Sequence, residues 1–97
     1  MSDWSLYIVE TRLGHWYTGI STDPTRRFAE HQSGGPKAAK ALKGKGPLSL
    51  IFQVPVGSRS QASRAEYWVK SLSRKQKKLL VAGRLTLPAF PCQASES

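Results

Sequence analysis

The sequence is poor in cysteine, in acidic residues and in long apolar runs. A single cysteine, Cys92, excludes an internal disulfide and a thiolate metal cluster, so a reducing cytoplasm is the expected location. No apolar run approaches the roughly 20 residues of a membrane-spanning helix, and residues 1–4 lack the basic-then-apolar pattern of a signal peptide. The 6 Asp and Glu residues are too scattered for the clustered carboxylates that a two-metal site needs.

Positive charge is in surplus. The 15 Lys and Arg residues give 97 residues a formal net charge of +9, and a field of this sign attracts polyanions. Nucleic acid is therefore the expected partner. An anionic membrane surface is the rival, but no helix pattern opposes bulky apolar residues to a lysine-rich face. A chain this short has one modest core, so a binding site must lie on the sheet face or in a shallow cleft.

The sequence predicts an α/β (α+β) fold, a small three-stranded antiparallel sheet flanked by helices. We expect strands at 4–10, 16–21 and 48–56 and helices at about 24–33, 60–72 and 73–83. The strands are rich in aromatic and β-branched residues, and Pro55 indicates an edge strand. Asp23 before Pro24 is typical of a helix start, Ser60 is the expected cap of the second helix, and Ser73 to Gln76 have the spacing of a capping box.

Two segments are expected to lie outside the regular elements. Residues 84–97, with Pro88 and Pro91, predict a poorly ordered tail after a domain formed by 1–83. A segment between the first helix and the third strand carries lysines among alanines and glycines, which we interpret as a loop that contacts nucleic-acid phosphates. Its lysines are Lys37, Lys40, Lys43 and Lys45.

Four polar side chains of the N-terminal half fall in related positions. Tyr7 and Tyr17 share one face of the predicted hairpin, because side chains alternate along a strand. With Phe28 as the buried reference, Arg27 and His31 lie about 100° and about 60° to the same side of the helix. The same helical count predicts that the side chains of Arg26 and Glu30 point into water.

Glu66 is the one acid that could complete a site with these residues. The other acids fall at a terminus, a strand end, a helix cap, an outer helix face or the tail, whereas Glu66 lies at the margin of its helix's apolar stripe. One carboxylate suffices for Mg²⁺, which keeps most of its waters. The alternative for Glu66 is a surface ion pair with Lys70, which would stabilise the helix by roughly a few tenths of a kcal/mol.

The residues named above resemble the GIY-YIG nuclease domain over roughly residues 4–82. The shared pattern is Tyr17, a glycine two residues on, an arginine eight after it and a histidine four further, with Tyr7 before them and Glu66 after. The chain is most similar to the short stand-alone bacterial members of the YhbQ type. That likeness lies in 18–23, 26–27, 31–34, 39–42, 44–46 and 65–67.

The resemblance implies a metal-dependent endonuclease that hydrolyses phosphodiester bonds of nucleic acid, with DNA as the expected substrate and repair or processing as the expected setting. It implies Tyr17 as general base with help from Tyr7, Arg27 on the scissile phosphate, His31 as an orienting or phosphate-contacting group, and Glu66 as ligand of one Mg²⁺ or Mn²⁺ ion. A free tyrosine, with a pKa of about 10, is a weak base at neutral pH, so a nearby cation or metal-bound water must favour its ionised form.

The sequence departs from the family pattern in ways that leave alternatives open. Ser5-Leu6 stands in place of Gly-Ile and Thr18 in place of isoleucine, and the asparagine that follows the glutamate in many larger members is missing, since the chain contains no asparagine. One alternative is therefore a nucleic-acid-binding module that cleaves slowly or not at all. Another is an accessory subunit that docks through its apolar tail, residues 85–90.

Further basic and aromatic residues are candidates for nucleic-acid contact. Lys70 is expected to bind nucleic acid, and Lys75, Lys77 and Lys78 form a basic helix face whose alternative role is solubility. The tryptophans are candidates for stacking on unpaired bases or for core packing. They are Trp4, Trp16 and Trp68.

Overall fold

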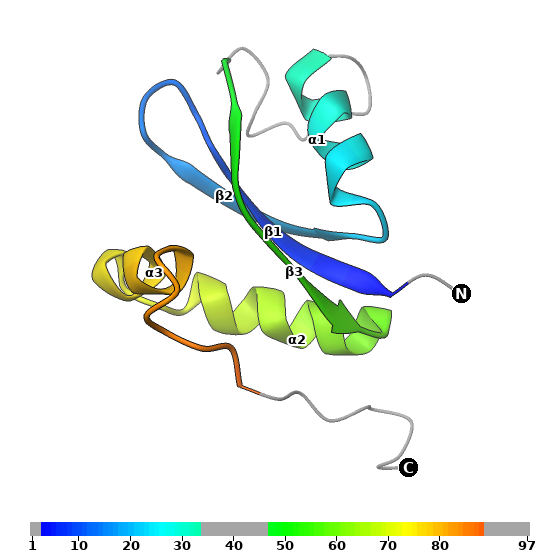
Figure 1. Cartoon of the computed structure of the whole chain (residues 1–97), viewed down its shortest axis with the longest axis vertical. Helices are drawn as coiled ribbons and strands as arrows, with labels where there is room; N and C mark the ends of the chain where they lie inside the picture. The colour runs from blue at the N-terminus through cyan, green and yellow to red at the C-terminus, as the bar shows by residue number, and fades with distance from the viewer. Residues whose placement is uncertain (1–2, 34–46, 89–97) are drawn as a thin grey trace.

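The computed structural model describes residues 3–33 and 47–88 (Figure 1). Its elements are β1 (Trp4–Glu10), β2 (Trp16–Ser21), α1 (Pro24–Ser33), β3 (Ser49–Gly57), α2 (Arg59–Lys70) and α3 (Arg74–Val81). The predicted order and the α+β class are confirmed. The predictions for Lys37, Lys40, Lys43, Lys45 and Cys92 lie outside the described residues. Within 3–33 and 47–88, no helix has the length and apolar character needed to cross a membrane.

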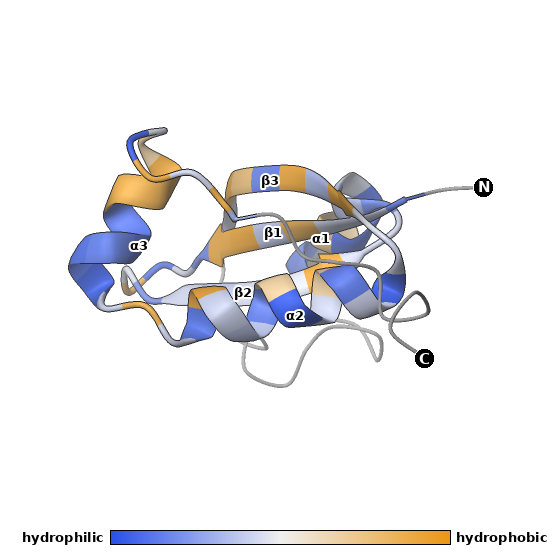
Figure 2. Cartoon of the chain, turned by 90° about the horizontal axis from the view of Figure 1, so that it is seen from below, coloured by the Kyte–Doolittle hydropathy of each residue, from blue (hydrophilic) through white to orange (hydrophobic). Residues whose placement is uncertain are grey.

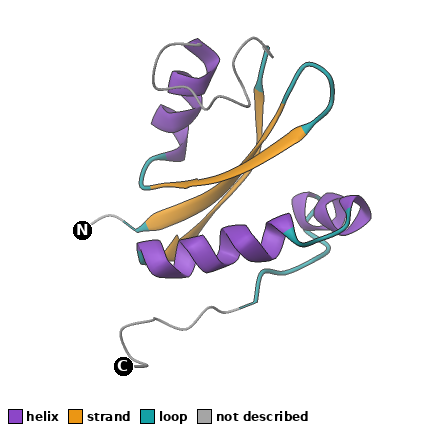
Figure 3. Cartoon of the chain, turned by 180° about the vertical axis from the view of Figure 1, so that it is seen from behind, coloured by secondary structure: helices purple, strands orange, loops and turns teal. Residues whose placement is uncertain are grey.

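The three strands form one antiparallel sheet in the order β2-β1-β3 (Figure 3). The central strand β1 is covered on both faces, so Leu6, Tyr7, Ile8 and Val9 are all buried. Because side chains alternate along a strand, Leu6 and Ile8 face one layer and Tyr7 and Val9 the other. Helix α1 lies on one side of the sheet, and α2 and α3 lie on the other (Figure 1).

The side with α2 and α3 holds the apolar core. Its buried residues are Leu6, Ile8, Ala65, Val69 and Leu80. Trp16 and Trp68 also pack against this cluster, and the Trp16 indole nitrogen donates to the Glu10 carboxylate at 3.0 Å. These two tryptophans therefore serve the core. Figure 2 shows that much of β1 and β3 consists of hydrophobic residues.

The chain after α3 continues the folded body. Leu85 and Leu87, which follow the expected domain end at residue 83, are half-buried and pack against the same core cluster. Gly83 has a φ of 82°, in the left-handed region that glycine adopts without steric cost, and this reverses the chain after α3. The described residues 84–88 thus form part of the domain.

Helix α1 is capped at its start and is tied near its end to the residue that precedes β3. Asp23 accepts a hydrogen bond from the Arg26 amide at 3.2 Å, which confirms the predicted cap. Near the other end, the Gln32 side chain accepts from the Leu48 amide at 2.9 Å and donates to the Leu48 carbonyl at 3.3 Å. These bonds hold the helix over the face that carries Tyr7 and Val9.

The start of α2 differs from the prediction. Ser58, in an extended conformation, is the cap, and its hydroxyl accepts from the Gln61 amide while the Gln61 side chain accepts from the Ser58 amide. The prediction of Ser60 was wrong because only Ser58 has a glutamine three residues later to close this reciprocal pair. The corresponding box of Ser73 and Gln76 at α3 is confirmed.

Candidate active site

The hairpin brings the two tyrosines to one face, as predicted. Tyr7 is paired with Gly19 and Val9 with Tyr17, and the centroids of the two tyrosine rings are 6.5 Å apart. A Cβ atom on Gly19 would lie 2.6 Å from the Tyr7 hydroxyl oxygen and 2.7 Å from its Cζ. Glycine at this position therefore allows the Tyr7 ring to lie across β2 beside Tyr17.

Helix α1 adds His31 to the tyrosine pair. The Tyr7 hydroxyl lies 3.0 Å from His31 Nε2, and both side chains are buried. The Tyr17 ring meets the His31 ring edge-on at 5.6 Å between centroids. Burial, followed by the positive charge of Arg27, lowers the pKa of His31, so the imidazole is neutral at neutral pH.

Arg27 lies beside the pair formed by Tyr7 and His31. Its positive charge opposes the rise in the pKa of Tyr7 and contributes to the lowered pKa of His31, so the guanidinium is within electrostatic reach of both side chains. Burial, with the neighbouring Tyr17 next in importance, raises the pKa of Tyr7 to about 12, so its hydroxyl keeps its proton at neutral pH. The direction of the hydrogen bond between the Tyr7 hydroxyl and Nε2 of His31 follows the tautomer of the imidazole.

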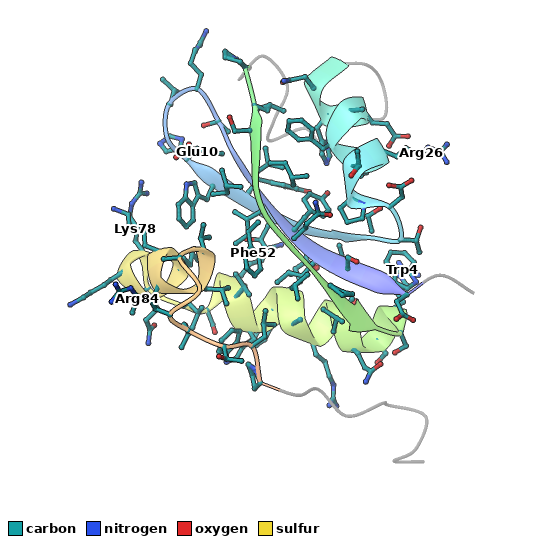
Figure 4. All side chains as sticks on the ribbon, in the orientation of Figure 1. Trp4, Glu10, Arg26, Phe52, Lys78 and Arg84 are labelled. Carbon is teal, nitrogen blue, oxygen red and sulfur yellow. The ribbon has the colours of Figure 1, made fainter. Side chains whose placement is uncertain are left out.

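The two arginines of α1 differ in exposure as the helical count predicted. The Arg26 side chain is 73% exposed and that of Arg27 31%. Figure 4 shows Arg26 directed away from the body of the protein. Arg27 also opens onto a polar hollow of about 160 Å³ beside the start of α1. The hollow is lined by Ser21, Thr22, Asp23, Arg26, Arg27 and Glu30.

The prediction that the Glu30 side chain points into water was wrong. Its carboxylate accepts from Arg27 Nη1 at 3.0 Å and lies 3.7 Å from Arg26 Nε, with the side chain only 24% exposed. The spacing of three residues from Arg27 and four from Arg26 favours both ion pairs on a helix. That spacing, visible in the sequence, was the signal that identifies Glu30 as a neighbour of the site.

Glu66 lies at the margin of the cluster. Its carboxylate is 3.2 Å from Lys70 Nζ, so the expected ion pair exists, and its side chain is 26% exposed. The negative charge of Glu66 contributes, as the smallest of the causes, to the raised pKa of Tyr7. The carboxylate therefore lies within electrostatic reach of the Tyr7 hydroxyl. Among the described residues no group of three or more His, Cys, Asp or Glu side chains gathers. This donor set fits one hydrated divalent cation and does not fit a two-metal site.

A larger groove of about 530 Å³ lies away from these residues. It is lined by apolar residues of β3, by Gln61, by Leu80 and by the segment after α3, and none of these described lining residues has a titratable side chain. The groove therefore offers no acid, base or anion-binding group, and the smaller polar hollow beside Arg27 is the candidate for chemistry.

Paired strands that carry two tyrosines, a helix that carries an arginine and a histidine, and a glutamate on a later helix define the GIY-YIG class of nuclease domain. A family model described as the GIY-YIG catalytic domain matches residues 3–79, and the chain belongs to this family. Members of the family act on nucleic acid.

The curated relatives are short proteins of the stand-alone type. The chain is 54% identical over 90 residues to a UPF0213 protein of Cronobacter sakazakii, covering 93% of each chain. It is 56% identical over 82 residues to the UPF0213 protein YhbQ of Escherichia coli, covering 84% of this chain and 80% of the relative. The resemblance to YhbQ-type proteins is thereby confirmed.

Solved structures agree with the fold. The chain is similar to the UPF0213 protein BH0048 from Bacillus halodurans, with 43% identity and a TM-score of 0.54 over 84% of this chain and 85% of that one. It is also similar to the protein EF2693 from E. faecalis, with 33% identity and a TM-score of 0.58 over 86% of each chain. The names of these relatives state no activity.

Proposed function

We propose that the protein is a metal-dependent endonuclease that hydrolyses phosphodiester bonds of DNA in the cytoplasm, in repair or processing. The observation that carries the proposal is the hydrogen-bonded pair of Tyr7 and His31 with Arg27 and Tyr17 beside it, next to a polar hollow that Arg27 lines. Phosphodiester hydrolysis needs a base for water and a countercharge for the developing negative charge on phosphorus oxygens. The cluster supplies candidates for both.

Tyr17 is the general base of this proposal, and Tyr7 holds the site in shape. Tyr7 is unsuited to accept a proton, because burial raises its pKa to about 12 and so keeps its hydroxyl protonated at neutral pH. Tyr17 is half-buried and accepts no hydrogen bond of this kind among the contacts described above. The attacking water gives its proton to the Tyr17 oxygen as the bond to phosphorus forms.

Arg27 binds the scissile phosphate. In the free protein its guanidinium is paired with Glu30, and both residues line the hollow. A phosphate with two oxygens in line with the fork can replace the carboxylate, with the shorter and stronger geometry of a bidentate pair. Glu30 thus holds Arg27 ready before substrate arrives.

Glu66 would hold the single divalent cation. Such an ion, when bound, supplies positive charge to the phosphate and leaving oxygens. In the ion-free protein the carboxylate is paired with Lys70 Nζ at 3.2 Å. Occupancy of the site then requires that Lys70 swing away, and its long side chain is 56% exposed and free to turn.

A second candidate is a nucleic-acid-binding module with little or no cleavage. It is favoured by the Glu66–Lys70 ion pair, which occupies the proposed metal ligand, and by the absence of asparagine from the sequence. The accessory-subunit alternative is less favoured, because Leu85 and Leu87 already pack against the protein's own core.

Cleavage of labelled single-stranded, duplex and branched DNA, with Mg²⁺ and with EDTA, tests the proposal. Arg27→Ala should lose about 10²- to 10³-fold in rate, as when a transition-state contact is removed, whereas Arg12→Ala, in the exposed hairpin turn, should stay within about threefold. Glu66→Gln should abolish the Mg²⁺-dependent cleavage. Lys70→Ala, which removes the partner of Glu66, should retain this cleavage.

Two results decide against the nuclease. Unchanged cleavage by Arg27→Ala would remove the phosphate role. Tight DNA binding without cleavage by any form of the protein, in the presence of Mg²⁺ or Mn²⁺, would establish the binding module in its place.

A further inference from the structure

Tyr67 is an aromatic side chain left in solvent. It is 79% exposed, more than the other large apolar side chains that lie at the surface of the described residues, Leu13 at 61% and Leu79 at 37%. A single exposed apolar residue is common and needs no explanation by itself. The surroundings of Tyr67 distinguish it from such a residue.

The position of Tyr67 on α2 is next to the candidate site. At about 100° per residue it lies opposite the apolar stripe of Ala62, Ala65 and Val69, and about 100° beyond Glu66. The helix therefore carries the aromatic ring just outside the carboxylate proposed to hold the metal.

The neighbours of Tyr67 on the helix surface leave the ring accessible. Residues three and four positions away are its contacts on a helix, and the two at four positions are the small side chains Ser63 and Ser71. The two at three positions are Arg64 and Lys70, one before and one after it. An aromatic face with cations on both sides is the arrangement that single-stranded nucleic acid requires, a base on the ring and phosphates on the cations.

The charge of the whole surface selects the partner. Residues 59–78 contain 7 Lys and Arg against Glu66 as the one acid. Figure 4 shows Lys78 and Arg84 projecting outward from α3 and the segment after it. A second copy of the chain would bring like charges together, and a membrane would need more apolar residues around the tyrosine than Arg, Lys and Ser provide. Duplex DNA would use the cations and leave the ring without a partner, because its bases are stacked on one another.

We propose that Tyr67 is a stacking platform for an unpaired base of single-stranded DNA, with Arg64 and Lys70 at the flanking phosphates. The inference rests on the proposed function and deepens it, since a platform beside Glu66 makes a single-stranded or branched segment the preferred substrate. Stacking tolerates any base, because every base has a π-face. Strandedness, and not sequence, is then what this surface recognises.

Binding measured in EDTA, without cleavage, tests the platform separately from the nuclease. Fluorescence anisotropy of a labelled oligothymidylate should show that Tyr67→Ala weakens binding by roughly 5- to 150-fold, the range for loss of one stacked base. A labelled duplex of the same length should change by less than about twofold. Tyr67→Phe and Tyr67→Trp should bind like the unchanged protein, and so should Leu13→Ala, the matched loss of an exposed apolar side chain.

Three results would overturn the platform. They are no binding of the oligothymidylate, equal binding by Tyr67→Ala, and equal weakening of single strand and duplex. Sedimentation adds a fourth, since a dimer that Tyr67→Ala converts to monomer would make the ring part of a subunit interface. A failure of the proposed nuclease would appear in the Mg²⁺ cleavage assay alone and would leave this binding result standing.

Discussion

The two faces of β1 use the same strand for different purposes. Leu6 and Ile8 face α2 and α3 and are buried among apolar side chains. Tyr7, between them in sequence, faces α1 and is buried against His31, Gly19 and the Arg27 guanidinium. Both faces are covered, yet the buried side chains around Leu6 and Ile8 are apolar, whereas the other face also holds the hydrogen bond between Tyr7 and His31.

The difference shows how a domain of this size can carry a site. A small chain has only one core, so the same strands must support both the fold and the site. Because side chains alternate between the two faces of a strand, neighbouring residues can serve stability and chemistry independently. Substitutions one residue apart should therefore separate the two properties.

The largest effect is expected on the apolar face. Ile8→Ala should lower the free energy of unfolding by about 2–5 kcal/mol, because it removes buried methylenes and leaves a cavity among Leu6, Ala65 and Val69. Tyr7→Phe, which keeps the ring and removes only the hydroxyl, should cost about 1–2 kcal/mol and should reduce cleavage more than Ile8→Ala does. Urea unfolding of both variants, with cleavage measured where the protein is folded, checks this. Equal losses of stability and of cleavage rate in the two would remove the distinction.

The next effect tests the contact between the strands on the α1 face. Gly19→Ala places a methyl group 2.6 Å from the Tyr7 hydroxyl oxygen, and the buried ring has no room to withdraw. We expect a loss of about 1–3 kcal/mol, the usual cost of an added methyl group in a packed site, together with loss of the bond from Tyr7 to His31.

A double-mutant cycle assigns that cost to the ring. In a Tyr7→Ala background the added methyl group meets only the Tyr17 ring edge, at 3.2 Å, so most of the cost of Gly19→Ala should disappear in urea unfolding. A cost that stays the same in both backgrounds would place the strain against Tyr17 or in the strand backbone and not against Tyr7.

Features that depend on neighbours in sequence were predicted well. The alternation in 4–10 and 16–21, the Asp23-Pro24 start and the Ser73–Gln76 box are local signals, and the structure has each of them. Ser58 and Ser60 were both possible caps for α2, and the hydrogen bonds between Ser58 and Gln61 make Ser58 the cap. A choice of this kind can be made from the sequence once the glutamine is considered.

Features that depend on distant contacts were not predictable in the same way. The closeness of Gly19 and Tyr7 follows from the register of β1 against β2, and the packing of Leu85 and Leu87 follows from where the chain returns after α3. The contact of Glu30 with the arginines was missed because a helical count follows the directions of the Cβ atoms, whereas a long side chain can turn sideways to reach an arginine. The roles of the site residues depend on a bound substrate and stay predictions.

The smallest expected effect is a dependence on pH that only the α1 face should show. The pKa of His31 is lowered by burial in the folded state, so between that value and the ordinary value of about 6.5 the unfolded chain binds a proton that the folded chain does not. Stability contributed by His31 is therefore complete above about pH 6.5 and is lost as the pH falls. Each unit of the difference corresponds to about 1.4 kcal/mol.

Urea unfolding between about pH 5 and pH 7 should show this slope, and His31→Gln should flatten it because the amide cannot take up the proton. Ile8→Ala on the opposite face should lower stability by the same amount at every pH, because the described side chains that pack around it in the core cluster are apolar. A slope that persists in His31→Gln would mean that protonation is carried by another group, and the contrast between an apolar face and a titrating face would then lose its chemical basis.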